Sequence, residues 1–325
     1  MHVTIYGAGA LGCVYGTHLA EAGVAVSFVT ARPRDPACAV TLERVGTSGI
    51  PRHLYGIDWR LSAPATTDLI LVTVAADVLA DVARTLAAGG SAPVVVLSPM
   101  LPPLYAELRE ILGERLFGGL PTAIAYHSPG SSRLEEVYRY WLPPAPTKFD
   151  DGTGHPGPPS DALLGYQATL AEFVKLLVKS GVPAALGPHM ADQAAAATLA
   201  MAPLMIALYV AGSVDALVAS HDLRDLAARA LDETHALVDR ALPKAALLGV
   251  GMTPAFVRSS LLGGAVALTK LVSPETILHL NAHFAHGKLR GQHAAFIVET
   301  SELATTHSLE TPALVALRER LALRP

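Results

Sequence analysis

Three glycines near the start of the chain have the spacing of a dinucleotide-binding loop. They belong to the run Gly7-Ala8-Gly9-Ala10-Leu11-Gly12, which follows a short strand pattern and opens a helical pattern. In that context the first glycine allows a tight turn, the second lets a pyrophosphate approach the backbone, and the third lets the helix pack on the strand. The helix N-terminus would then face the phosphates with unpaired N–H groups. The alternative interpretation is a glycine-rich turn without a ligand.

The end of the second predicted strand indicates which dinucleotide is bound. NAD-binding proteins usually place Asp or Glu there to bind the ribose 2′-hydroxyl, whereas residues 29–34 read VTARPR. Arg32, with Thr30 and Arg34 beside it, has the charge to pair with a 2′-phosphate; the alternative is a solvated loop charge. We therefore expect NADP(H), with Val74 at the end of a later apolar run completing the cofactor site.

Histidine is the second residue type that could do chemistry, because its pKa lies near neutrality. The chain has thirteen, and the spacing of four of them near the C-terminus would place them on one face of a continuous helix. These four are His279, His283, His286 and His293. Three interpretations stay open: a substrate-facing polar surface, a metal site that uses His279 and His283, and histidines that are solvated or buried in an interface.

Two further candidates follow predicted strands of the first half. Ser98 comes after the apolar run 93–97, and His127 ends the run TAIAYH. The carboxyl ends of parallel strands are where ligands bind in open α/β sheets. The two cysteines, Cys13 and Cys38, match no metal-ligand or redox spacing.

Alternating strand and helix patterns would position these residues in the first part of the chain. Strands are predicted at 2–6, 24–30, 68–74, 93–97, 116–126, 136–141 and 182–186, and helices at 10–22, 76–88, 104–112 and 162–180. This alternation predicts an α/β Rossmann domain with a doubly wound, mostly parallel sheet over residues 1–188. The Pro- and Gly-rich stretch 143–160 is predicted to be a loop.

Alanine- and leucine-rich helical patterns dominate the rest of the chain. They cover 190–219, 222–249, 253–270, 274–286, 289–306 and 311–323. We expect an all-α domain over residues 189–325 that binds substrate and forms a homodimer. Residues 194–213 carry no charge and are long enough to span a bilayer. However, Pro203 interrupts them, and the central helix of an all-helical domain has the same composition, so we expect a buried core helix.

Composition excludes some partners. The net charge is −4 and the basic residues are scattered, so the electrostatic footprint of a nucleic-acid-binding protein is missing. The chain opens on a strand pattern rather than a secretory signal. We expect a cytoplasmic protein that binds a small-molecule substrate, without nucleic acid or membrane as a partner.

Three segments together resemble the ketopantoate reductase family. They are HVTIYGAGALGCVYGTHLAEAGVAVSFVTARP at the start, the strand DLILVTVAA, and the apolar helix TLAMAPLMIAL with its central proline. The resemblance implies an NADPH-dependent reductase of a 2-oxo acid or related carbonyl, with substrate bound in a cleft between the two domains. It also implies that Arg32 is the arginine that binds the 2′-phosphate.

The catalytic residues that the resemblance would imply are not all present. The family's proton-donating lysine falls near Ala194, within ADQAAAATLA, which contains no lysine. Two family asparagines fall at Thr198 and Ala202, and a strand-ending lysine falls at Ala75. Ser98 begins the run that replaces an asparagine–glycine pair.

The C-terminal segment departs from the family as well. His293 replaces a substrate-binding glutamate, and Asn281 falls where a family serine contacts the carboxylate. We expect His293 to donate the proton, with Asn281, Ser98 and His127 as further catalytic candidates. Arg290 or Lys288 would pair with a substrate carboxylate, and Thr198 would line the same site.

The resulting hypothesis is an NADP-dependent oxidoreductase that reduces a carbonyl or imine other than ketopantoate. Hydride transfer to such a group needs a proton donor near the acceptor, and the family's lysine is missing. Two alternatives follow from that absence: an NADP(H)-binding sensor without turnover, and a non-redox protein that uses the cleft with or without a metal.

Overall fold

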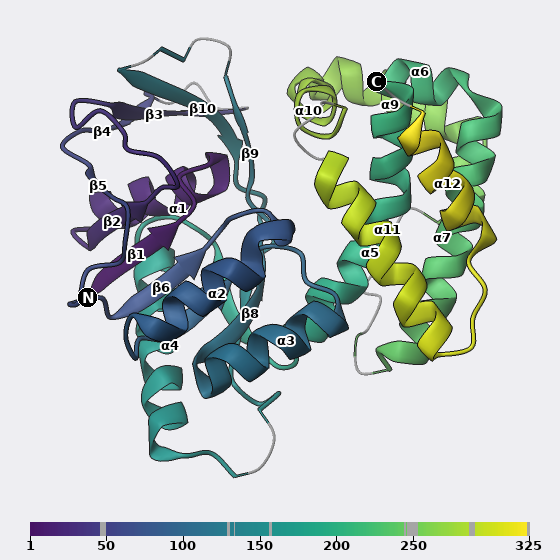
Figure 1. Ribbon diagram of the computed structural model, residues 1–325. Helices are drawn as coiled ribbons and strands as arrows, with labels where there is room; N and C mark the ends of the chain where they lie inside the picture. Colours follow the sequence, from purple (N-terminus) through teal and green to yellow (C-terminus); the bar gives the residue numbers. More distant parts are fainter. Residues whose placement is uncertain are drawn as a thin grey trace. The chain divides into compact units, whose positions relative to one another are not determined.

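The computed structural model describes residues 1–45, 50–128, 131–132, 134–155, 158–243, 245, 253–285 and 290–323 (Figure 1). The chain divides into two compact units. The first contains Met1–Pro99 and Leu104–Ala191, and the second contains Met100–Pro103 and Asp192–Pro325. The boundary predicted after residue 188 falls just before this division.

The first unit is built on an eight-stranded, mostly parallel sheet. Its strands are β1 (His2–Tyr6), β2 (Ala25–Val29), β5 (Asp58–Arg60), β6 (Leu69–Val72), β7 (Val94–Val96), β8 (Leu116–Leu120), β11 (Thr147–Asp150) and β12 (Ala184–Gly187), in the order β12-β11-β8-β7-β6-β1-β2-β5. Among the described strand pairs of this sheet, only β8–β11 is antiparallel. The predicted doubly wound sheet is confirmed.

Helices complete this unit because the central strands are apolar on both faces. Leu69 and Ile70 of β6, and Val94 and Val95 of β7, point to opposite faces of the sheet and are at most 4% exposed, as expected for strands covered on both sides. The covering helices are α1 (Ala10–Glu21), α2 (Leu79–Ala88), which follows a 3₁₀ turn (Ala76–Val78), α3 (Pro102–Leu112), which leads into a second 3₁₀ turn (Gly113–Arg115), and α4 (Asp161–Lys179).

A second, four-stranded sheet was not predicted. It contains β3 (Ala39–Arg44), β4 (Arg52–Leu54), β9 (Ile124–His127) and β10 (Glu135–Trp141), in the order β4-β3-β10-β9. The predicted strand 116–126 is therefore wrong as a single element: its first part is β8 of the large sheet and its last part belongs to β9. Leu120 ends β8 and Pro121 follows it, so the ladder cannot simply continue.

The predicted loop 143–160 also contains a strand. β11 lies within it and pairs with β8 and β12. Phe149 is fully buried there and Asp150 is 1% exposed. The Asp150 carboxylate accepts the Gly152 backbone N–H at 2.9 Å, and burial raises the pKa of this carboxyl to about 6.

The described part of the second unit is helical, which confirms the all-α prediction. Its elements are α5 (Met190–Ala211), α6 (Val214–Ala219), α7 (His221–Ala241), α8 (Pro254–Arg258), α9 (Leu261–Val272), α10 (Pro274–His279), a π-helical turn (Leu280–Phe284), α11 (Arg290–Thr306) and α12 (Pro312–Ala322). The single helices predicted at 190–219 and 253–270 are each divided in two. Gly212 has a positive φ of +85° between α5 and α6, and the Ser213 hydroxyl then caps α6.

Helix α5 carries the long uncharged run. By length and composition it could cross a membrane, but 61% of its most apolar stretch is buried inside the protein. Leu199 and Ile206 on this helix have no exposed surface and belong to the apolar core of the second unit. A core helix of a soluble protein has these same properties.

Candidate functional site

The glycine loop connects β1 to α1, with Ala10 and Leu11 opening the helix. Gly7 has a φ of +102°, a conformation that favours glycine, and its N–H donates to the Val29 carbonyl at 3.1 Å. A Cβ on Gly12 would lie 2.1 Å from the Gly7 carbonyl oxygen. These two glycines are therefore required for the turn and for the close approach of helix and loop.

Gly9 differs from its neighbours because the local fold does not require a glycine there. Its backbone is extended (φ −83°, ψ −175°), a conformation that any residue adopts. A Cβ on Gly9 would meet no atom within 4 Å. The open space lies in a pocket, so the missing Cβ leaves room for a ligand to approach the backbone, which is the fit that a pyrophosphate needs.

The pocket beside the loop has a volume of about 1170 Å³. Its lining includes the loop residues Tyr6, Gly7, Ala8 and Gly9, the segment that follows β2 (Val29 to Pro36), and Cys38, Leu61, Val74, Val78, Val82 and Thr85. The volume is sufficient for an extended dinucleotide, since drug-sized ligands occupy pockets of roughly 300–1,000 Å³. Val74, predicted as a cofactor contact, lies on this wall.

Arg32 and Thr30 lie at the pocket as the sequence predicts. The Thr30 hydroxyl donates to the Arg32 carbonyl at 2.7 Å, and the Thr30 N–H donates to the Arg60 carbonyl at 2.9 Å. The Arg32 side chain is exposed and forms no ion pair with the residues that the structure describes. Its backbone is thus fixed while its guanidinium is available to an anionic ligand.

Arg34 lies in the same pocket but is already engaged. It forms an ion pair with Glu136 of β10, and its guanidinium carbon lies 5.2 Å from the centre of the Trp59 ring. Its Nη2 donates to the Ala8 carbonyl at 3.4 Å. The Glu136 partner could not be predicted from local sequence, because it comes more than a hundred residues later in the chain.

Sequence reasoning also missed part of the pocket wall. Val78, Val82 and Thr85 line it from the α2 region, at a spacing that places them on one helical face, and that periodicity was available in the sequence. Asp35 lines the pocket as well, and its carboxylate accepts the Ala37 N–H at 3.0 Å. The pocket therefore does contain a carboxylate, three residues beyond Arg32.

The two strand-end candidates have different positions. Ser98, just after β7, is 5% exposed and its hydroxyl donates to the Val74 carbonyl, beside the pocket wall. His127 ends β9, which pairs antiparallel with β10 in the small sheet. The prediction that His127 ends a strand of the large parallel sheet is wrong, since the chain leaves that sheet after Leu120. The His127 ring packs edge-on against Tyr138, with centroids 5.4 Å apart.

The candidates of the second unit lie on several helices. His293 of α11 is 5% exposed and packs edge-on against Tyr209 of α5, with centroids 5.3 Å apart. The Asn281 side chain accepts the Val214 N–H at 2.8 Å, at the start of α6. The Thr198 hydroxyl donates to the Ala194 carbonyl at 2.8 Å within α5. Asn281 and Thr198 thus satisfy backbone groups of their own unit.

The predicted histidine face does not run through one α-helix. Helix α10 ends at His279, and a π-helical turn follows, which changes the angular spacing of the side chains. His279 is 8% exposed and packs against Phe284. Arg290 begins α11, and its Nη2 lies 3.5 Å from the Ala322 carbonyl oxygen. Outside the described residues lie the predicted His286 and Lys288, as well as the His283 side chain.

Among the described side chains, no group of three or more His, Cys, Asp or Glu is arranged to hold a metal ion. Both cysteines are free thiols and buried. Burial raises the pKa of the Cys13 thiol to about 12. A buried thiol with a raised pKa is a poor nucleophile.

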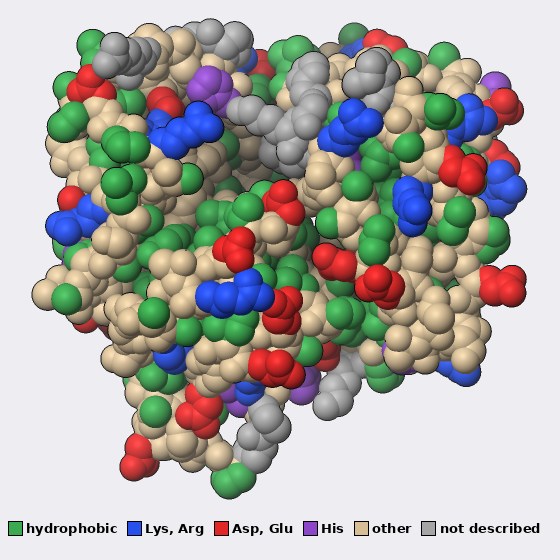
Figure 2. Space-filling view, in the orientation of Figure 1, with side chains coloured by type: hydrophobic (Ala, Val, Ile, Leu, Met, Phe, Trp, Pro, Cys, Tyr) green, Lys and Arg blue, Asp and Glu red, His purple; other side chains and the backbone are tan. Residues whose placement is uncertain are grey.

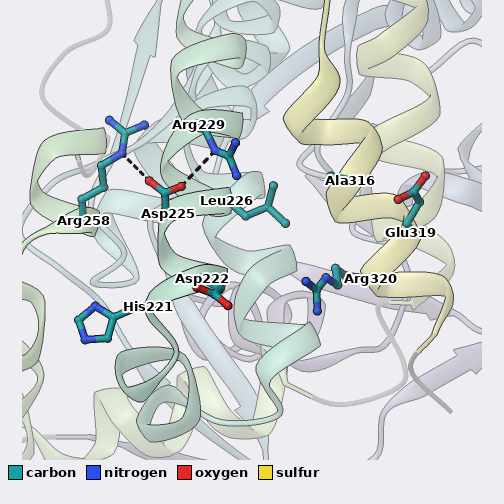
Figure 3. Close-up of a pocket in the computed structure, with 9 residues that line it drawn as sticks. All are labelled: His221, Asp222, Asp225, Leu226, Arg229, Arg258, Ala316, Glu319 and Arg320. Carbon is teal, nitrogen blue, oxygen red and sulfur yellow. Dashed lines mark hydrogen bonds and ion pairs between the residues drawn. The ribbon is translucent and has the colours of Figure 1, made fainter.

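The second unit has a pocket of about 640 Å³ between α7, α8 and α12 (Figure 3). Three of its charged lining residues pair with one another, since Asp225 lies 3.2 Å from both Arg229 and Arg258. Arg258 also lies 2.9 Å from Asp232, outside the lining. It has no glycine loop and contains none of the predicted site residues. On the face shown in Figure 2, Lys and Arg side chains are scattered among acidic and apolar ones, as the sequence indicated.

Comparison with known proteins relates part of the chain to one family. Residues 3–135 match the sequence model of the family described as ketopantoate reductase PanE/ApbA. The match covers this part of the chain and confirms the resemblance seen in the sequence. The family is one of oxidoreductases. No curated protein matches the chain.

Solved structures with the same fold cover nearly the whole chain. One is 2-dehydropantoate 2-reductase from Geobacter metallireducens GS-15, at 16% identity and a TM-score of 0.70, covering 99% of both chains. A ternary structure of D-mandelate dehydrogenase with NADH and anilino(oxo)acetate has 15% identity and a TM-score of 0.65, covering 99% of this chain and 97% of that one. Dimeric ketopantoate reductase from Staphylococcus aureus has 12% identity and a TM-score of 0.65, covering 99% and 98%.

Proposed function

We propose that the protein is an NADPH-dependent reductase of a small 2-oxo acid, or of a related carbonyl or imine, other than ketopantoate. The observation that carries the proposal is the glycine loop, whose Gly9 leaves open space toward a pocket that also exposes the Arg32 guanidinium. The family match over residues 3–135 supports the reaction type. A fold shared with a D-mandelate dehydrogenase bound to NADH and an oxo-acid derivative supports the substrate class.

Each part of the pocket has a role toward the cofactor. The N–H groups of the glycine loop and of the first turn of α1 would bind the pyrophosphate, helped by the helix dipole. Arg32 would bind the 2′-phosphate, because no acidic side chain of the described residues neutralises it. The bound nicotinamide supplies the hydride for the carbonyl carbon. Val74, Val78 and Val82 form an apolar wall that would exclude water from this side of the pocket when the cofactor is bound.

The proton for the carbonyl oxygen must come from the protein or from ordered water. His293 remains our predicted donor, with Asn281, Ser98 and His127 as the other catalytic candidates. Arg290 and Lys288 remain the predicted partners of the substrate carboxylate, and Thr198 a predicted contact in the interdomain cleft. The pH profile of kcat in His293→Gln, compared with Ser98→Ala and His127→Gln, tests the assignment. Unchanged profiles in all three would refute it.

Cofactor preference is tested by titrating the protein with NADPH and with NADH, using the fluorescence of the reduced nicotinamide. We expect Arg32→Ala to weaken NADPH binding ten- to a hundredfold, the loss of a charge-assisted hydrogen bond of about 1.5–3 kcal/mol, while NADH binding stays nearly the same. Arg84→Ala is the control, since Arg84 is an exposed arginine on α2 that pairs with Asp81 and Glu107. Tighter binding of NADH, unaffected by Arg32→Ala, would contradict the choice of NADPH.

The substrate is sought by following NADPH oxidation against a panel of 2-oxo acids and cyclic imines that includes ketopantoate. We expect turnover with a member other than ketopantoate. The absence of lysine from the Ala194 region favours one alternative, an NADP(H)-binding sensor. Tight NADPH binding without oxidation by any member would support that alternative.

The assembly and location of the protein are also proposals. We expect a cytoplasmic homodimer, without nucleic acid or membrane as a partner. The Staphylococcus aureus relative is described as dimeric. Light scattering at several protein concentrations measures the assembly of this chain.

A further inference from the structure

Two side chains of the small sheet, Tyr138 and Glu136, support the glycine loop together with Arg34 of the segment that follows β2. Tyr138 and Glu136 are neighbours on one face of β10, two residues apart. The Tyr138 hydroxyl reaches two acceptors, the Ala8 carbonyl oxygen at 3.3 Å and the Glu136 carboxylate. The Glu136 carboxylate also pairs with Arg34, whose Nη2 lies 3.4 Å from the same Ala8 oxygen. The Ala8 carbonyl oxygen thus lies beside two donors, Arg34 and Tyr138. The Glu136 carboxylate contacts both of them, and the single Tyr138 hydroxyl hydrogen is shared between Glu136 and Ala8.

The direction of this carbonyl decides the direction of an N–H group of the loop. In a trans peptide the C=O of Ala8 and the N–H of Gly9 point in opposite directions. With the Ala8 oxygen turned toward Arg34 and Tyr138, the Gly9 N–H faces away from them. The neighbouring carbonyls are fixed as well, since Gly7 O accepts the Thr73 hydroxyl at 2.8 Å and Gly9 O accepts the Cys13 N–H at 2.9 Å.

The three side chains have little freedom to rearrange. Tyr138 is 3% exposed, and burial raises its pKa above the usual value, so its hydroxyl keeps the hydrogen that it donates. The side chains of Arg34 and Glu136 are 26% and 18% exposed. The Arg34 guanidinium has a carboxylate as one neighbour and the Trp59 ring as another, and such a cation–π contact further restricts it.

We propose that Glu136 and Tyr138 are positioning residues for cofactor binding: through Arg34 and the Ala8 carbonyl they aim the Gly9 N–H at the pyrophosphate. They do this from a sheet that lies outside the βαβ unit of the glycine loop. The inference rests on the proposed function, because it requires a dinucleotide in the pocket. The inference also assigns different roles to the two arginines: Arg32 binds the 2′-phosphate, and Arg34 holds the conformation of the loop.

The test compares Tyr138→Phe and Glu136→Gln with the unmodified protein. The probes are NADPH, NADH and adenosine 2′-monophosphate, which has the 2′-phosphate but no pyrophosphate. We expect both variants to bind NADPH and NADH three- to tenfold more weakly, about the value of one hydrogen bond, and adenosine 2′-monophosphate with unchanged affinity. Hydrogen exchange of the amides of residues 7–12 should be faster in both variants without nucleotide. Glu43→Gln is the control, since Glu43 pairs with Arg139 in the same sheet at 3.1 Å.

The sign of the Glu136→Gln effect separates positioning from simple electrostatics. A carboxylate repels phosphates, so if Glu136 acted only through its charge, its removal would tighten NADPH binding. Tighter or unchanged NADPH binding in Glu136→Gln, or an equal loss for adenosine 2′-monophosphate, overturns the inference. If Tyr138→Phe does not fold, Glu136→Gln alone decides, because it preserves the size of the side chain. Failure of the unmodified protein to bind either dinucleotide would instead refute the proposed function.

Discussion

Replacing single glycines of the loop by alanine separates what the fold requires from what the ligand requires. A methyl group on Gly9 meets no protein atom within 4 Å, whereas one on Gly12 would lie 2.1 Å from the Gly7 carbonyl oxygen and 2.7 Å from the Thr73 hydroxyl. Gly9→Ala should therefore fold normally and bind cofactor poorly. Gly12→Ala should fold poorly.

The magnitudes follow from these contacts. Gly9 is the N-cap of α1 in an extended conformation that alanine can also adopt. Alanine would stabilise the fold by about 0.4–1 kcal/mol, because it lowers the conformational entropy of the unfolded chain. It would destabilise the fold by a similar amount, because it is a less favourable N-cap than glycine. The unfolding free energy should change by less than about 1 kcal/mol. Displacing the pyrophosphate from one or two N–H groups, at about 1.5–3 kcal/mol for hydrogen bonds to a charged group, weakens NADPH binding at least tenfold. Gly12→Ala should lose about 1–3 kcal/mol or more of stability through overpacking.

The assay combines urea unfolding followed by circular dichroism, without nucleotide, with a fluorescence titration by NADPH. Gly165→Ala is the matched control, because Gly165 lies inside α4 and has open space around its Cα. That variant should be slightly more stable and bind NADPH normally. If Gly9→Ala bound NADPH as tightly as the unmodified protein, the pyrophosphate would not approach the backbone at Gly9, and the assignment of this pocket would be wrong.

Three further predictions concern charged groups. The pKa of Asp150 is raised to about 6, so between pH 4 and 6 the folded state binds more protons at this carboxyl than the unfolded state does, and the unfolding free energy falls as the pH rises. Asp150→Asn should therefore recover as much as ~3 kcal/mol of unfolding free energy at pH 8 and little at pH 4. Chemical denaturation at the two pH values measures this. Burial lowers the pKa of His18 to about 4, so the unfolding free energy should fall by up to ~3 kcal/mol as the pH drops from 6.5 to 4. This loss of stability should be smaller in His18→Gln. An equal loss in that variant would exclude His18 as the cause. Arg258→Gln should cost less than about 1 kcal/mol in thermal unfolding, because its ion pairs with Asp225 (Figure 3) and with Asp232 are solvent-exposed, and a larger loss would contradict this view of the pocket.

Local patterns were sufficient to predict the parallel centre of the large sheet and the glycine turn between β1 and α1. The strands β6 and β7 are short apolar runs that are buried on both faces, and the glycine spacing can be recognised within one strand–turn–helix unit. These features depend on residues that are close in sequence, so a single sequence contains the information.

The small sheet could not be predicted in the same way, because its pairing is long-range. Ala39 lies opposite Glu135 in the β3–β10 pair, and no periodicity within either strand indicates this partner. The role of Arg34 was missed for the same reason: its charge was visible in the sequence, but its neutralising partner Glu136 was not. In the helical unit, the π-helical turn after His279 changed a spacing that had been assumed to be regular.

The partnership between Arg34 and Glu136 has a consequence for the order of events during synthesis. Residues 1–34 contain the whole nucleotide fingerprint, yet the carboxylate that holds Arg34 belongs to β10, which ends at Trp141. A nascent chain that has left the ribosome only as far as α3 contains the glycine loop but not Glu136 and Tyr138 of β10, which hold it. Contacts between residues far apart in sequence form late, because they require closure of long loops. Nucleotide affinity in the growing chain should therefore rise only after β10 has emerged, which makes the cofactor a reporter of a completed domain.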